Sequence, residues 1–77
     1  MNRPCTPQEI ISRAHDSVTR AKSTASLQYF SDAGIGAINC LFDLGLIGTD
    51  SWRVASHLLS ALADRRNAEL EEQGGKA

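Results

Sequence analysis

The stretch LGLIGTD, residues 44–50, has the pattern of one helix ending and the next beginning directly after it. Gly45 can adopt the left-handed backbone conformation that commonly follows the last turn of a helix. Leu46 or Ile47 can then fold back as the hydrophobic contact that accompanies such a cap. The stretch therefore predicts two helices joined by a short turn.

The helix after this turn is expected over residues 50–73. Thr49 or Asp50 is expected to cap it, because short polar side chains accept hydrogen bonds from first-turn N–H groups. One side of this helix carries the apolar residues Trp52, Ala55, Leu58, Leu59 and Leu62. Arg65 and Glu69 follow four positions apart, a spacing that allows an ion pair. At 1.5 Å per residue the helix is about 34 Å long, so its last turns should project from the domain or meet a partner.

The helix before the turn is expected over residues 26–45, although the pattern also allows a start near residue 32. Gly34 and Gly36 each cost about 1 kcal/mol relative to alanine in a helix interior. Close packing of another helix on the small surface of Ala33, Gly34 and Ala37 would offset that cost. The segment between Ser23 and Trp52 contains no lysine or arginine, which favours a central, largely buried helix.

The first helix is expected over residues 7–23. Thr6, Pro7 and Glu9 have the spacing of a capping box, with proline at the first helical position. Its apolar stripe consists of Ile11, Ala14, Val18, Ala21 and Ala25. Because three of these five residues are alanine, the helix buries little alone and needs a neighbour.

Composition limits the protein to one small helical domain. The chain has 77 residues, a net charge of −1 and 42% hydrophobic residues, which is too apolar for a disordered chain. We expect a single all-α domain of three helices over residues 1–77, with flexible ends at 1–5 and 74–77. The near-zero net charge indicates neither nucleic acid nor a membrane as a partner. Two cysteines without an export signal predict reduced thiols in the cytoplasm.

The potential metal ligands have the wrong spacing for a zinc site. Zinc modules usually place two ligands two to four residues apart, whereas Cys5 and His15 are ten apart and Cys40 and His57 are seventeen apart. Cys40 is expected to be a small buried residue, and the two imidazoles to be partly exposed. A Cys40–His57 nucleophile pair would also need an orienting group and a pocket. We therefore assign no catalytic, cofactor-binding or metal-binding residue.

DNA binding is the alternative function, with the third helix as the recognition helix of a helix-turn-helix-like arrangement. Arg53, Arg65 and Arg66 would supply its positive charges. The turn contains two glycines and is more typical of a relaxed helical hairpin. The first turn of the third helix also offers only one cationic residue. A strip of Arg13, Arg20 and Lys22 on the first helix is more simply a solvated face.

The number of large apolar residues near the turn exceeds the number that the alanine-rich first helix can cover. This surplus favours an oligomer or a protein partner. Trp52 either anchors the helical hairpin or forms an exposed apolar contact beside Leu46 and Ile47. Tyr29 and Phe30 are adjacent and cannot both face one core, so at least one should lie at its rim.

The sequence thus predicts a small helical protein–protein interaction module that assembles as a homodimer. It would act in the cytoplasm as a regulator or inhibitor, such as those of phages and plasmids, by binding another protein. No cofactor and no membrane association are expected. The expected contact residues are Leu46, Ile47, Trp52, Leu59, Leu62, Arg66 and Leu70.

Overall fold

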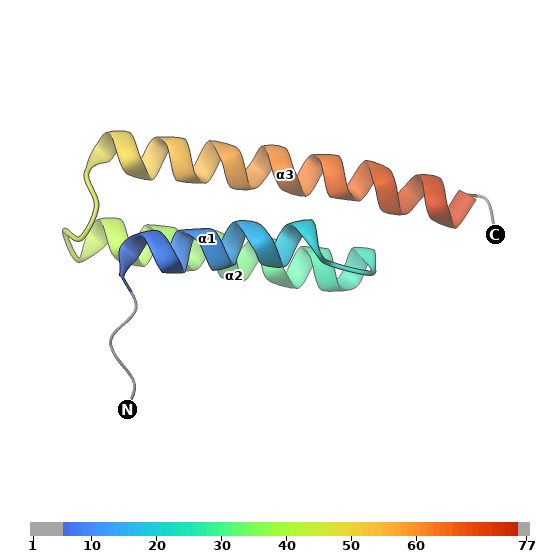
Figure 1. The fold of residues 1–77 in the computed structure, drawn as a ribbon, viewed down its shortest axis with the longest axis horizontal. Coiled ribbons are helices and arrows are strands. Elements are labelled where there is room, and N and C mark those ends of the chain that lie inside the picture. The colour runs from blue at the N-terminus through green and yellow to red at the C-terminus, as the bar shows by residue number, and fades with distance from the viewer. Residues whose placement is uncertain (1–5, 76–77) are drawn as a thin grey trace, which may run out of the picture.

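The computed structural model describes residues 6–75 and contains three helices: α1 (Pro7–Thr19), α2 (Thr24–Asp43) and α3 (Thr49–Gly75). Helices α1 and α3 run in the same direction, and α2, which connects them in the chain, runs in the opposite direction (Figure 1). No strand occurs among the described residues, and the expected all-α, three-helix fold is confirmed. None of these helices is both long and apolar enough to cross a membrane.

The flexible ends expected at residues 1–5 and 76–77 lie outside the described residues. Residues 74 and 75, which were also expected to belong to a flexible end, lie in the last turn of α3. The C-terminal end of α3 extends past the ends of the other two helices, as its length predicts (Figure 1).

Helix α1 begins as expected and ends four residues early. The Thr6 hydroxyl accepts a hydrogen bond from the Glu9 N–H at 3.2 Å, and the Glu9 carboxylate accepts one from the Thr6 N–H at 3.2 Å. The predicted end at residue 23 is wrong because Ser23 is the N-cap of α2, where its hydroxyl accepts from the Ser26 N–H at 3.1 Å. Ala21 is a buried residue of the connection between α1 and α2, whereas Ala25 is exposed on α2. The spacing of these alanines continues through a turn and does not mark one helix.

Helix α2 starts two residues before residue 26, the earlier of the two predicted positions, and ends two residues before the predicted residue 45. Gly45 adopts the left-handed conformation, with φ of 74°. Its N–H donates to the Phe42 carbonyl at 3.0 Å, and the Leu46 N–H donates to the Leu41 carbonyl at 2.9 Å. These two bonds form a Schellman motif and satisfy carbonyls that the helix end leaves free. The predicted glycine cap is confirmed.

Helix α3 begins one residue before its predicted start. The Gly48 carbonyl accepts the first helical bond, from the Trp52 N–H at 2.9 Å. Thr49 and Asp50 therefore lie inside the first turn, and the prediction that one of them is the cap is wrong. Gly48 can occupy the cap position because glycine is nearly as favourable there as the polar residues are.

The core lies where all three helices meet, and Val18, Ile38 and Leu59 are its fully buried members. Gly34 lies at the closest approach. A Cβ on Gly34 would be 2.9 Å from Cδ2 of Leu59 and 3.2 Å from Cβ of Ala14. The close packing expected from the glycines of α2 therefore occurs at Gly34, while Ala33, expected on the same surface, is exposed and Ala37 is half-buried.

Alanine at the two glycines of α2 should shift stability in opposite directions. Gly36 has open space around its missing Cβ, so Gly36→Ala should raise the free energy of unfolding by about 0.5–1 kcal/mol. Gly34→Ala gains the same helix propensity but overpacks a tight contact, so a net loss of about 1–2 kcal/mol is expected. Urea denaturation of both variants measures the difference, and changes of equal sign would contradict the assigned helix contact.

Candidate interaction surface

Three of the seven expected contact residues lie in the core. Leu59 is fully buried, and Ile47 and Leu70 retain only 9% and 8% exposure. Their side chains pack within the domain, so little of their surface is available to a partner. Leu59 and Leu58 are neighbours on α3, and helix geometry directs only Leu59 toward α1 and α2.

Trp52 anchors the hairpin formed by α2 and α3. Its ring stacks on Phe42 with centroids 5.1 Å apart, and its Nε1–H donates to the Asn39 side-chain oxygen at 2.8 Å. Trp52 is half-buried, as is Leu62, and both pack against the core. Tryptophan in this environment has an intramolecular partner for both its ring and its N–H group.

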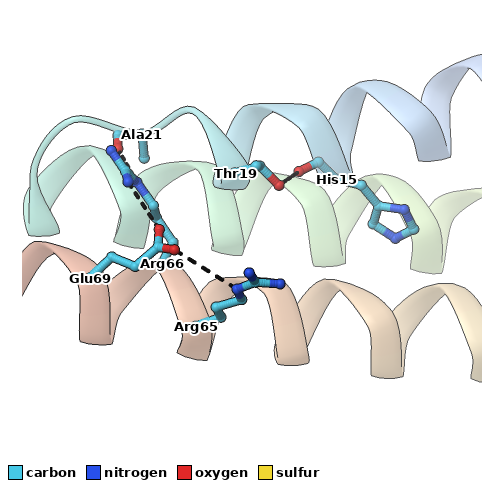
Figure 2. A network of polar contacts seen from close by, with 6 residues as sticks. All are labelled: His15, Thr19, Ala21, Arg65, Arg66 and Glu69. Carbon is cyan, nitrogen blue, oxygen red and sulfur yellow. Dashed lines mark hydrogen bonds and ion pairs between the residues drawn. The ribbon is translucent and has the colours of Figure 1, made fainter.

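Arg66 ties α3 to the connection between α1 and α2. Its Nε–H donates to the Ala21 carbonyl at 2.7 Å, and its Nη1 lies 3.0 Å from the Glu69 carboxylate (Figure 2). The expected Arg65–Glu69 pair is confirmed, with Nε and the carboxylate oxygen 3.8 Å apart. Because only 20% of the Arg66 side chain is exposed, its main contacts are within the domain.

One apolar surface remains at the turn between α2 and α3. Leu44 is 67% exposed and Leu46 is 56% exposed. The two glycines of the turn, Gly45 and Gly48, leave open space beside them. We call Leu44 and Leu46 the hairpin surface. Among the expected contact residues, Leu46 alone lies well exposed.

A second apolar surface runs along the outer side of α3. Val54 is 66% exposed and Leu58 is 45% exposed, and Ala61 is exposed one turn further. We call these three residues the α3 seam. Leu58 is thus exposed although it belongs to the apolar side expected for this helix, and Val54 is absent from the expected contact residues. The spacing of 4 and 3 residues along the seam is the signal that could have identified it.

The seam borders a groove of about 460 Å³ between α1 and the start of α3. Ile11, Val54 and Ala55 give the groove an apolar wall. Its polar lining residues are Gln8, Ser12, His15, Asp50 and Ser51. The groove is therefore a mixed surface at the N-terminal ends of two parallel helices.

His15 connects the two helices that line this groove, α1 and α3. Its Nε2 lies 3.1 Å from the Ala55 carbonyl oxygen, and this nitrogen carries the proton because a carbonyl can only accept. Serine, histidine and aspartate could together form a nucleophilic triad. Within residues 6–75, however, no hydrogen bond joins His15 to Ser12, Ser51 or Asp50.

The other reactive groups lie apart from the groove. Cys40 is exposed on α2, so its expected burial is wrong. The uncharged sequence around it suggested a buried position, but Cys40 lies on the outer side of its helix. No group of three His, Cys, Asp or Glu side chains in the described part of the chain could hold a metal ion.

The two helices joined by the turn do not have the crossed arrangement of a helix-turn-helix. Helices α2 and α3 lie side by side in opposite directions (Figure 1), whereas helices of a helix-turn-helix cross at about 90–120°. Of the three expected positive charges, Arg66 is held by the Ala21 carbonyl. No family model, curated protein or solved structure matches this chain.

Proposed function

We propose that the protein is a small interaction module that regulates or inhibits a target protein by binding it. The observation that carries the proposal is the exposure of large apolar side chains on two separate surfaces, the hairpin surface and the α3 seam. Exposed apolar patches of small proteins commonly mark protein-binding sites. Two surfaces allow one module to bind a target and to self-associate as a homodimer in the cytoplasm.

The hairpin surface is the one proposed to bind the target. The turn between α2 and α3 lies at one end of the bundle (Figure 1), and Leu44 and Leu46 are both exposed there. Asp43 is beside them, and the chain from Ser23 to Trp52 contains no basic residue. A complementary target site would have an apolar pocket bordered by lysine or arginine, because matched charges favour encounter and orientation.

A pull-down with matched variants tests this proposal. The wild-type protein is immobilised and exposed to a lysate of its native host, with and without nuclease. We expect the wild type to capture one protein in stoichiometric amount, with and without nuclease. The double variant Leu44→Ser/Leu46→Ser should not capture it. Val54→Ser, which changes an equally exposed side chain on the α3 seam, should retain it.

Two outcomes would contradict the proposal. Equal capture by the wild type and the hairpin variant would show that this surface does not bind the target. Recovery of nucleic acid, with an affinity that falls steeply as salt rises, would instead support the DNA-binding alternative. Circular dichroism checks that the variants remain folded.

A further inference from the structure

A charged residue lies on the same side of α3 beyond each end of the α3 seam. Asp50 lies in the first turn of α3, and Arg65 lies one turn beyond Ala61, with 79% of its side chain exposed. The two charged residues and the three residues of the α3 seam form one outward stripe. Its members follow one another at spacings of 4, 4, 3 and 4 residues: Asp50, Val54, Leu58, Ala61 and Arg65. Such spacings are typical of the contact side of a helix that pairs with another helix.

The stripe is complementary to itself when a second copy runs in the opposite direction. The midpoint between Asp50 and Arg65 falls between residues 57 and 58. Reversal about that point places Asp50 opposite Arg65, Val54 opposite Ala61, and Leu58 next to its own copy. A two-fold interface requires this kind of pattern, because the same patch must serve both subunits.

We propose that a second copy of this chain covers the α3 seam, with the two α3 helices antiparallel and Leu58 next to the two-fold axis. The inference rests on the proposed function as an interaction module and names the partner of one of its two surfaces. Asp50 of each copy pairs with Arg65 of the other, so the dimer contains two such pairs.

The two charged residues of the stripe have no short ion pair among the described residues. The Asp50 carboxylate makes no ion pair or hydrogen bond with residues 6–75, and the contact of Arg65 with Glu69 is long, at 3.8 Å. The stripe from Asp50 to Arg65 spans about 23 Å of helix. Only three apolar residues lie on this length, so a weak dimer with a dissociation constant in the range of about 1–100 μM is expected.

Charge reversal tests the pairing. Asp50→Arg places arginine opposite arginine twice per dimer, and Arg65→Asp places aspartate opposite aspartate twice. Each variant alone should raise the dimer dissociation constant by about 10- to 30-fold in sedimentation equilibrium. Mixing the two variants should restore association, because every pair in the mixed dimer then joins opposite charges. The double variant Asp50→Arg/Arg65→Asp should also dimerise like the wild type.

A crosslink tests the register. In a background with Cys5→Ser and Cys40→Ser, Leu58→Cys should form a disulfide-linked dimer under mild oxidation, because the two residues lie next to the axis. Ala61→Cys is the matched control on the same stripe. It should crosslink poorly, because in this register the two copies of residue 61 are about 10 Å apart along the helix axes.

The outcomes separate this inference from the proposed function. A wild-type protein that stays monomeric up to about 1 mM would overturn the dimer, while the pull-down through Leu44 and Leu46 would still decide target binding. A dimer whose two charge variants do not restore each other, or that crosslinks equally at residues 58 and 61, would overturn the antiparallel pairing. Restoration in the mixture with crosslinking at residue 58 alone would establish it.

Discussion

Leu59→Ala is expected to lower the free energy of unfolding by about 2–5 kcal/mol. Leu59 is fully buried, and its two methyl groups fill the space over Gly34, where the helices approach most closely. Shortening the side chain removes apolar contacts and leaves a cavity that α1 and α2 cannot close without moving. A domain of 77 residues has a total stability of only about 4–12 kcal/mol, so this loss is a large fraction of it.

Leu58→Ala is the matched control for this prediction. The same atoms are removed one residue away, from a side chain that is 45% exposed, and a loss below about 1 kcal/mol is expected. Urea unfolding followed by circular dichroism measures both variants, at a protein concentration where the wild type is monomeric. Equal losses for the two leucines would contradict the orientation of α3 described above.

Trp52→Ala should have the second largest effect, a loss of about 2–3 kcal/mol. The variant removes the stack on Phe42 and the hydrogen bond to Asn39. Trp52 is only half-buried, and the Asn39 side chain is exposed and can bond to water afterwards. The loss should therefore be smaller than that of a tryptophan in the centre of a core.

Trp52→Phe separates the two contributions. Phenylalanine retains an aromatic ring beside Phe42 but has no N–H donor, so a loss of about 0.5–1.5 kcal/mol is expected. The same urea experiment measures it. If Trp52→Phe is as destabilising as Trp52→Ala, the stack on Phe42 contributes little to stability.

Local signals in the sequence predict the helices and the turn well. The capping box at Thr6 and the glycine cap at Gly45 depend on residues within a few positions of each other, and both occur as expected. The four-residue spacing of Arg65 and Glu69 also predicts their pair. Each of these features depends on backbone geometry that neighbouring residues determine, so no knowledge of the rest of the fold is needed.

Which member of an apolar pair faces the core could not be predicted in this way. Leu58 and Leu59 are chemically identical, and only the direction in which α3 packs makes one exposed and the other buried. Leu46 and Ile47 present the same ambiguity at the turn. The candidate surfaces consist of the members of such pairs that point outward, so the sequence places them correctly only to within a residue.

The end of α1 was missed for a related reason. Ala21 continues the spacing of the apolar stripe, but it lies in the connection after the end of α1, where its side chain is buried. Its carbonyl accepts from Arg66, which is 45 positions away. A contact over that distance leaves no local pattern in the sequence.

The directions of the three helices leave the molecule with an uncancelled macrodipole. Helices α1 and α3 are parallel, and α2 opposes only one of them (Figure 1); each helix carries about half a positive charge at its N-terminus and half a negative charge at its C-terminus. Glu9 and Asp50 lie in the first turns at the positive end, while no helix has a basic residue in its last turn. Antiparallel pairing of two copies would bring opposite ends together and cancel the net dipole, an electrostatic benefit that a parallel dimer lacks.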